Sequence, residues 1–239
     1  MIDLHTHFLP GVDDGAQTLD EGLALARMAV ADGIHVAVMT PHVHPGRYEN
    51  RLSNLRDRFA AFRGALADAG IPLEIRLAGE VRLGMEALTL LLEGDLPILG
   101  EVDGYRVMLL EFPHQTLPVG TQQFIEKLLK MRVRPLIAHP ERNKAVMLQP
   151  ERLGLLLDAG CWLQLTAGSL TGRFGESARK TAQFIVRNRW AHVIATDSHN
   201  AAHRPPALAE GHKVVAELVD VTYANQLVQD NPARILGVS

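Results

Sequence analysis

The sequence predicts an α/β protein whose parallel strands close into a (β/α) barrel. Short apolar runs rich in β-branched residues alternate along the chain with longer segments of helical periodicity. No Ser/Gly-rich linker, charge block or low-complexity tract interrupts this alternation, so we predict that residues 1–239 form a single domain. A chain of 239 residues is long enough for one barrel of this kind. An open, doubly wound sheet is the alternative architecture.

The first strand and the first helix carry clear local signals. The apolar run at residues 2–4 predicts a buried strand. Thr18-Leu-Asp-Glu21 is a capping box, in which a hydroxyl and a carboxylate satisfy free N–H groups at the start of a helix. Gly33 ends the helical periodicity that follows, because glycine readily adopts the left-handed conformation found after a helix. We therefore predict a helix between Thr18 and Gly33.

The remaining elements follow from the same patterns. Six more strands are predicted at residues 36–39, 73–77, 106–110, 134–138, 162–165 and 192–195. Helices are predicted between them at residues 50–69, 84–92, 119–131, 150–159, 176–188 and 205–219. Seven strands that alternate with helices favour the closed barrel over the open sheet.

Composition excludes several classes of protein. A formal net charge of -3 gives no electrostatic reason to expect binding to nucleic acid or to an anionic membrane. The start of the chain lacks a basic and apolar leader, and no apolar stretch approaches the roughly 18 residues of a membrane span. We therefore expect a cytoplasmic protein without membrane insertion. A lone cysteine, Cys161, leaves histidines and carboxylates as the available metal ligands.

Histidines and carboxylates follow nearly every predicted strand. They are His5 and His7, His42, Glu80, Glu111, His139, and the pair Asp197 and His199. The strand at residues 162–165 is the exception, because Thr166 follows it. The carboxyl ends of parallel strands meet at one end of a barrel, so we expect these side chains to lie close together. A single His-x-His pair would be a weak signal, but the whole set indicates a metal site.

One aspartate of the loop Asp13-Asp14-Gly15 raises the set to nine candidate ligands. Nine nitrogen and oxygen donors suit two or three divalent ions, and a mixed imidazole and carboxylate shell favours Mn, Fe or Zn over Mg or Ca. Three such ions against four carboxylates keep a formal charge of about +2, which a phosphate monoester dianion would cancel. The sequence therefore points to phosphate as the substrate group.

Two arginines lie in the same ring of predicted loops. Arg142 follows the strand at residues 134–138, and Arg204 follows the last strand. A guanidinium group matches two phosphate oxygens in a bidentate geometry. Because both arginines stand next to ligand motifs, we predict that they bind the substrate phosphate, although a solvated arginine is the alternative for each.

These motifs resemble the polymerase and histidinol phosphatase (PHP) superfamily. The resemblance is carried by Asp3-x-His5-x-His7, Pro10-Gly-Val-Asp-Asp-Gly15, Thr40-Pro-His42, Gly79-Glu80, Ile137-Ala-His139-Pro-Glu-Arg142, Ala195-Thr-Asp197-Ser-His199 and Arg204-Pro-Pro206. Their order and spacing are similar to those of the bacterial metal-dependent protein-tyrosine phosphatases of capsule and exopolysaccharide loci, and the match spans nearly the whole chain.

The resemblance implies a distorted (β/α)7 barrel and a site for two or three divalent ions, with manganese first and iron or zinc as alternatives. The implied activity is hydrolysis of phosphotyrosine on a cognate bacterial tyrosine kinase, in the control of capsular or exopolysaccharide production. The implied metal ligands are His5, His7, Asp14, His42, Glu80, Glu111, His139, Asp197 and His199. The choice of Asp14 over Asp13 rests on the resemblance, and Arg142 and Arg204 match the arginines that contact phosphate. Oligomeric state is left open.

The expected reaction is in-line attack of a metal-activated hydroxide on phosphorus. A tyrosine leaving group, with a pKa of about 10, needs a general acid less than an alkoxide would, although His203 or His44 is available. A cysteine nucleophile in a Cys-x5-Arg motif is excluded, because the residue six positions after Cys161 is Ala167.

Three other functions remain open at the level of sequence. A small-molecule phosphatase, such as a histidinol-phosphate phosphatase, would use the same metals. A phosphodiesterase acting on nucleic acid is disfavoured by the acidic net charge. A non-enzymatic, metal-stabilised module is disfavoured because structural sites need fewer ligands.

Overall fold

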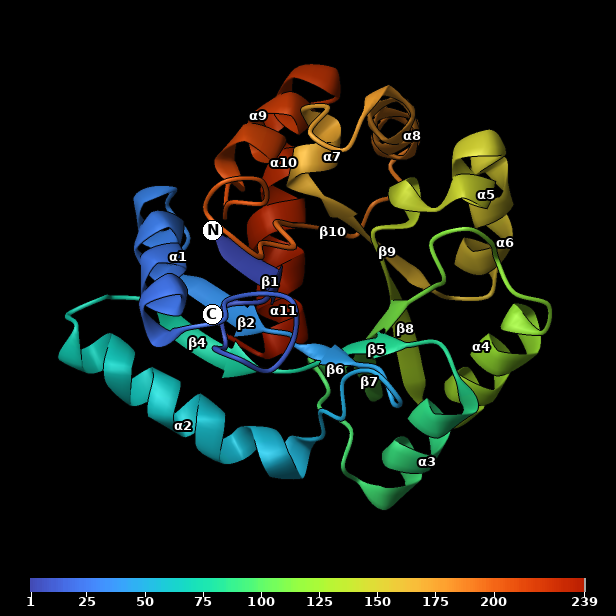
Figure 1. Ribbon diagram of the computed structural model, residues 1–239. Coiled ribbons are helices and arrows are strands. Elements are labelled where there is room, and N and C mark those ends of the chain that lie inside the picture. Colours follow the sequence, from blue (N-terminus) through green and yellow to red (C-terminus); the bar gives the residue numbers. More distant parts are fainter. Residues whose placement is uncertain (239) are drawn as a thin grey trace.

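The computed structural model describes residues 1–238, and its central feature is a ring of parallel strands surrounded by helices (Figure 1). The ring contains β1 (Ile2–Thr6), β2 (Val36–Met39), β4 (Glu74–Leu77), β7 (Tyr105–Glu111), β8 (Val133–Ala138), β9 (Trp162–Thr166) and β10 (Val193–Ala195). Each of these corresponds to one of the seven strands predicted from the sequence. Within this set, β1 pairs with β2, β2 with β4, β7 with β8, β8 with β9 and β9 with β10, and each of these pairs is parallel.

At two positions in the ring, a bend divides the strand into two short strands. β2 continues into β3 (His42–Val43), and β4 continues into β5 (Glu80–Arg82). β2 pairs with β4, β3 pairs with β5, and β5 pairs with β7, so the ladder passes from one sheet to the other at these bends. Pro41 has no N–H to donate at the first bend. At the second, a Cβ on Gly79 would lie 2.7 Å from Val43 Cγ2.

The ring closes between the last strand and the first. The N–H of Asp197 donates to the carbonyl of His5 at 2.8 Å, and the N–H of His7 donates to the carbonyl of Ser198 at 2.9 Å. The predicted closed barrel of seven strand positions is thus confirmed, and it is distorted by the two bends. These closing bonds also bring ligand motifs from opposite ends of the sequence side by side.

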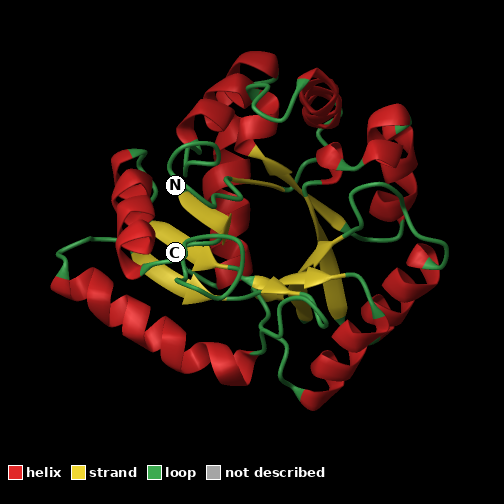
Figure 2. Ribbon diagram, viewed as in Figure 1, coloured by secondary structure: helices red, strands yellow, loops and turns green. Residues whose placement is uncertain are grey.

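Seven helices predicted from the sequence lie on the outside of the ring (Figure 2). They are α1 (Leu19–Ala31), α2 (Leu52–Asp68), α3 (Met85–Glu93), α4 (Thr121–Lys130), α6 (Leu153–Asp158), α8 (Glu176–Arg187) and α9 (Ala209–Leu218). The Thr18 hydroxyl accepts the Glu21 N–H at 3.3 Å, as the capping box predicts. The Glu21 carboxylate, however, accepts the N–H of Gln17 rather than that of Thr18.

Several short elements were not predicted. They are β6 (Gly100–Val102), α5 (Lys144–Leu148), α7 (Ala167–Leu170), α10 (Val221–Asn225), α11 (Asn231–Leu236), and the single turns η1 (Pro140–Arg142) and η3 (Gln226–Asp230). Another single turn, η2 (Pro150–Arg152), lies within a predicted helix. β6 forms an antiparallel hairpin with β7 through Asp103-Gly104, both at positive φ, which is a recognisable hairpin signal in the sequence. The predicted helix at residues 150–159 is divided into η2 and α6, and the one predicted at 205–219 begins only at Ala209, after Pro205-Pro206.

Apolar side chains form two clusters that leave one end of the barrel free for polar groups. One cluster fills the space between the strands and the outer helices. The other lies inside the ring and includes Leu4, Val38, Leu109, Leu136 and Ile235. Ile235 belongs to α11, which lies across the amino-terminal end of the ring in Figure 1. Within residues 1–238, no helix has the length and apolar character needed to cross a membrane.

Candidate metal centre

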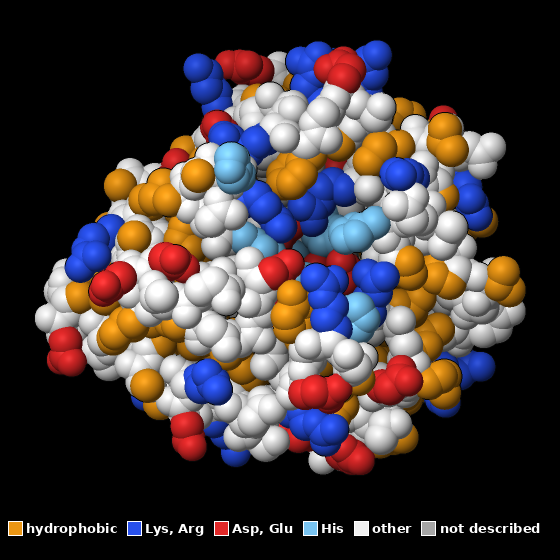
Figure 3. All heavy atoms as spheres, in the orientation of Figure 1, with side chains coloured by type: hydrophobic (Ala, Val, Ile, Leu, Met, Phe, Trp, Pro, Cys, Tyr) orange, Lys and Arg blue, Asp and Glu red, His pale blue; other side chains and the backbone are white. Residues whose placement is uncertain are grey.

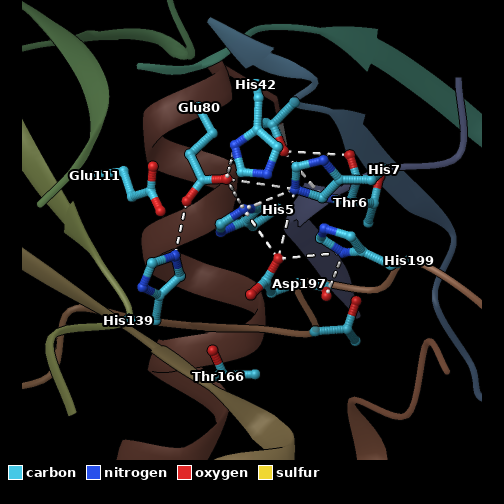
Figure 4. A network of polar contacts seen from close by, with 12 residues as sticks. His5, Thr6, His7, His42, Glu80, Glu111, His139, Thr166, Asp197 and His199 are labelled. Atoms are coloured by element: carbon cyan, nitrogen blue, oxygen red, sulfur yellow. Dashed lines mark hydrogen bonds and ion pairs between the residues drawn. The ribbon is translucent and has the colours of Figure 1, made fainter. Parts of the chain in front are cut away.

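The nine predicted ligands lie near the carboxyl ends of the strands and surround one centre. Figure 4 labels all of them except Asp14. Donor atoms within 4.8 Å of one another occur in three groups, which are His5, His7, Glu80 and Asp197; His7, His42 and His199; and His42, Glu80 and Glu111. His139 joins the centre through Glu80, at 2.7 Å, and Asp14 joins through His42, at 3.2 Å. The closing of the barrel therefore brings together residues from both ends of the chain.

Glu80 lies between the groups and touches four histidines. Its Oε2 lies 3.2 Å from His5 Nε2, 3.5 Å from His7 Nε2 and 3.0 Å from His42 Nδ1. Its Oε1 lies 2.7 Å from His139 Nε2. A carboxylate with two oxygens aimed at different donors is suited to bridging two ions. Gly79 at the bend of the strand lets Glu80 reach this position.

Three histidines are oriented by hydrogen bonds on the ring nitrogen that faces away from the centre. His5 Nδ1 bonds to Gln164 Oε1 at 2.9 Å, and His7 Nδ1 to Asp13 Oδ2 at 2.7 Å. His199 Nδ1 bonds to the Asp197 carbonyl at 3.0 Å. All three acceptors are oxygens, so each Nδ1 carries a proton and Nε2 is the nitrogen turned towards the centre. Burial opposes a charged His7, but the Asp13 carboxylate raises its pKa well above the usual value, so His7 must release a proton from Nε2 when it binds an ion.

The two aspartates of the loop after β1 have different surroundings. Asp13 is buried and accepts the backbone N–H groups of Gly15 at 2.9 Å and His42 at 3.0 Å as well as His7 Nδ1. The Asp14 side chain is 45% exposed, and its Oδ1 lies 3.2 Å from His42 Nε2 and 3.6 Å from His199 Nε2. Asp14 thus faces the centre, whereas Asp13 supports a ligand from behind.

The residues present fit divalent ions. Glu80 Oε2, Asp197 Oδ1 and His199 Nε2 are buried atoms that lack a hydrogen-bond partner within residues 1–238. Buried polar atoms are normally satisfied, so three such acceptor atoms at one centre are suited to binding positive ions. His139 and Asp197 also adopt positive φ values of 33° and 52°. Such strain in non-glycine residues is typical of functional sites.

The buried carboxylates are held in their charged form. Burial works to raise the pKa of Glu80 and Asp197, but both pKa values lie well below the usual range. The imidazoles of His5 and His42 hold that of Glu80 down, and the Arg142 guanidinium, with His5, holds that of Asp197 down. The nearby rings of His199 and His42 likewise lower the pKa of Asp14. Glu111 differs, because burial and the charge of Glu80 raise its pKa. Divalent ions would compensate this concentration of negative charge.

The histidines divide into two groups. Burial lowers the pKa of His139 to about 3, with the charge of Arg142 adding to the effect, and burial lowers that of His199 to about 4. Both rings are therefore neutral near pH 7, which is the form that binds metal. Burial also opposes a charged His42, but Glu80 and Asp14 raise its pKa to about 10, so His42 must release a proton when it binds an ion.

Both predicted arginines reach the centre through one carboxylate. Arg142 and Arg204 each place Nη2 close to Asp197 Oδ2, at 2.5 and 2.6 Å. The Nε atom of each is buried, and no residue in the described part of the chain accepts a hydrogen bond from it. Two adjacent guanidinium groups with donors to spare are suited to binding an anion next to the predicted ligands.

A cavity of about 390 Å³ opens above the centre. Glu80, His139 and Asp197 are among its lining residues, and so are both arginines. Figure 3 shows this hollow, ringed by basic and histidine side chains, in the middle of the face that carries the carboxyl ends of the strands. Of the two proposed general acids, His44 lines the cavity, whereas His203 is exposed outside it.

Sequence reasoning missed the residues that support the ligands. Gln164 is a buried polar residue in the middle of β9. A glutamine within an apolar strand is a signal in the sequence that could have identified it. Asp13 was considered only as a rival ligand. Phe174 lines the cavity from the loop before α8, in a segment without a recognisable motif. Cys161 is buried and its pKa is raised to about 12, so it remains a thiol, as expected for a core residue.

Comparison with known proteins agrees with the motifs. The sequence model of the family described as capsular polysaccharide synthesis, CpsB/CapC, matches residues 1–237. The chain is also similar to the tyrosine-protein phosphatase YwqE of Bacillus subtilis (strain 168). The two are 33% identical over 204 residues, which cover 85% of this chain and 79% of YwqE.

Solved structures extend the likeness to three dimensions. Crystal structures of YwqE from Bacillus subtilis and CpsB from Streptococcus pneumoniae are described as those of unique metal-dependent tyrosine phosphatases. The matched chain from these structures superposes on the present structure with a TM-score of 0.91 and 29% identity, and the match covers 100% of this chain and 96% of the matched chain. The phosphotriesterase homology protein of Escherichia coli matches with a TM-score of 0.59 over 98% of both chains. Its identity is 11%, so that likeness concerns the barrel fold alone.

Proposed function

The chain belongs to the CpsB/CapC family of capsular polysaccharide synthesis. On this basis we propose which substrate it hydrolyses and which residues of its cavity bind the ions and the phosphate. The chain is a metal-dependent tyrosine phosphatase of the CpsB/CapC type, and the resemblance that its motifs indicated is confirmed. We propose that its substrate is phosphotyrosine on a cognate bacterial tyrosine kinase, and that residues 1–239 act as one domain in the cytoplasm.

The nine converging side chains are the proposed ligands of two or three divalent ions, with manganese first and iron or zinc as alternatives. The observation that carries this proposal is that buried Glu80, Asp197 and His199 atoms accept no hydrogen bond from any residue among 1–238. Bound divalent ions supply Lewis acidity, since they lower the pKa of water and neutralise charge on phosphoryl oxygens. Gln164 and Asp13 keep His5 and His7 in the tautomer that presents Nε2 to an ion.

The two arginines bind and orient the phosphate. In the absence of substrate they share Asp197 Oδ2, and their buried Nε atoms remain free donors within the described chain. A phosphate dianion beside them accepts these donors and gains charge-assisted hydrogen bonds. Donors fixed in place before the reaction stabilise the charge that develops on the phosphoryl oxygens. The phenolate of tyrosine leaves with a pKa of about 10 and so depends little on a general acid.

The test measures metal dependence and substrate choice together. Protein stripped of metal with a chelator is expected to lose hydrolysis of a phosphotyrosine peptide and of p-nitrophenyl phosphate. Addition of Mn²⁺, Fe²⁺ or Zn²⁺ should restore it, and the ion that restores the highest activity identifies the preferred metal. His5→Ala and Glu80→Ala should abolish activity. Undiminished turnover in stripped protein would contradict the proposal. Higher turnover on histidinol phosphate than on the peptide would favour a small-molecule phosphatase instead.

The arginine roles have their own test. Arg142→Gln and Arg204→Gln are expected to lower kcat/KM by about 10² to 10³, the usual loss for a donor that stabilises transition-state charge. Arg152→Gln is the matched control, because Arg152 is exposed in η2 and lies outside the cavity. Equal effects of all three substitutions would show that general charge, and not phosphate binding, is responsible.

A further inference from the structure

Phe174 occupies a position in the cavity to which no role has been given. Its ring lies against both phosphate-binding arginines, with Arg142 Cζ 4.6 Å and Arg204 Cζ 5.9 Å from the ring centroid. The side chain is partly exposed and lines the cavity. A phosphate bound to the two guanidinium groups would therefore have an aromatic ring as its immediate neighbour.

The loop that carries Phe174 is held in a fixed conformation. It connects α7 to α8, and Gly172 and Gly175 both adopt φ of +90°, which favours glycine. The N–H of Arg173 donates to the carbonyl of Gly168 at 2.8 Å. A Cβ on Gly168 would lie 3.2 Å from Phe174 Cε2, so the ring packs closely on the backbone of α7. The ring is thus placed before any substrate arrives.

Tyr48 approaches the cavity from another side. It follows β3, and its ring is stacked on His42 with 5.5 Å between centroids and 12° between planes. Three strand positions, β5, β7 and β8, separate β3 from β9, the strand that precedes the Phe174 loop. Phe174 and Tyr48 therefore line the cavity from two separate parts of the ring, while the metal ligands form its floor.

We propose that Phe174, together with Tyr48, forms an aromatic entrance that selects phosphate esters of an aromatic alcohol. This inference rests on the proposed function and specifies how the same pocket recognises its substrate. A phosphate held by Arg142 and Arg204 carries its ester group towards the cavity mouth, because the ligands close the floor. Aromatic rings attract one another in offset or edge-to-face arrangements, so a phenyl ring gains contacts there that an alkyl group lacks.

The test compares aromatic and non-aromatic substrates in the metal-loaded enzyme. Phe174→Ala is expected to raise KM for p-nitrophenyl phosphate and for a phosphotyrosine peptide by about 3-fold to 10-fold, the range typical of one aromatic contact. Acetyl phosphate, an activated phosphate without a ring, should change by less than about 2-fold. The inhibition constant of phenylphosphonate should rise by the same factor as KM, while that of methylphosphonate stays constant. These inhibitors report on binding without any chemical step.

Matched variants separate selection of the ring from support of the arginines. Phe174→Tyr should restore the preference for aromatic substrates, whereas Phe174→Leu, which keeps most of the volume, should not. Phe59→Ala is the control, because Phe59 also lies near an arginine, Arg63, but on the outer helix α2. Equal losses on acetyl phosphate and p-nitrophenyl phosphate would overturn the proposal. If the unaltered enzyme fails to hydrolyse phosphotyrosine, the proposed function fails, whatever Phe174→Ala does to phenylphosphonate binding.

Discussion

Asp13→Asn should weaken metal binding without removing a ligand. Asp13 Oδ2 accepts N–H groups from His7, at 2.7 Å, and His42, at 3.0 Å, while Oδ1 accepts that of Gly15, at 2.9 Å. An asparagine amide has one oxygen and one NH₂ group. In its better orientation the oxygen keeps the two histidine bonds and the NH₂ group faces the Gly15 N–H, so at least one buried donor loses its acceptor.

The magnitude follows from these contacts. One unsatisfied buried donor costs about 1–3 kcal/mol of stability, and the metal-free protein should unfold several degrees earlier, at about 2–4 °C per kcal/mol for a chain of this size. Loss of the charged acceptor behind His7 should weaken metal affinity by about 10-fold to 100-fold. Thermal unfolding of stripped protein and competition with a chromogenic chelator measure the two effects separately.

Two variants make this result interpretable. Asp14→Asn removes a proposed ligand, so it should reduce the number of bound ions while the half-exposed position leaves the unfolding temperature nearly unchanged. Asp20→Asn makes the same change of charge at an exposed position in α1 and should have neither effect. The reasoning is refuted if Asp13→Asn lowers the number of bound ions and Asp14→Asn does not.

Three further predictions concern the fold. Gly15→Ala should destabilise the protein by more than about 1 kcal/mol, because a Cβ at this position would overlap His7. Gly64→Ala should stabilise it by about 0.5–1 kcal/mol, because Gly64 lies in α2 with open space around its Cα. Denaturant unfolding that ranks the two variants in the reverse order would contradict this. Burial lowers the pKa of His192 to about 4, so its contribution to the free energy of unfolding is complete above pH 6.5 and is lost as the pH falls through 4. Relative to His192→Asn, the unaltered protein should lose about 2–4 kcal/mol of stability over that range, and parallel pH profiles of the two proteins would refute the assignment. Asp32→Ala should lower the free energy of unfolding by about 1–2 kcal/mol, because the Asp32 carboxylate accepts two N–H groups at the start of α9, and an unchanged unfolding temperature would exclude that role.

Much of the barrel could be predicted from local patterns. The seven strand positions and seven outer helices follow from apolar periodicity and from signals such as the Thr18 cap and Gly33. The short elements could not be, because α7 has four residues and β3 has two, too few to show a period. The bends after Met39 and Leu77 were also missed, since they depend on how the ladder passes from β4 to β7.

By itself, the sequence determined which chemical groups follow each strand, and hence the kind of site this protein carries. Histidines and carboxylates at strand ends are a local property, and parallel topology makes their meeting a consequence of the fold class. Only the tertiary structure decided the roles within that set. It placed Asp14 towards the centre and Asp13 behind His7, and it set Phe174 against the two arginines. These roles depend on the direction of each side chain and on contacts between residues far apart in the sequence, and the periodicity of the sequence carries no information about either.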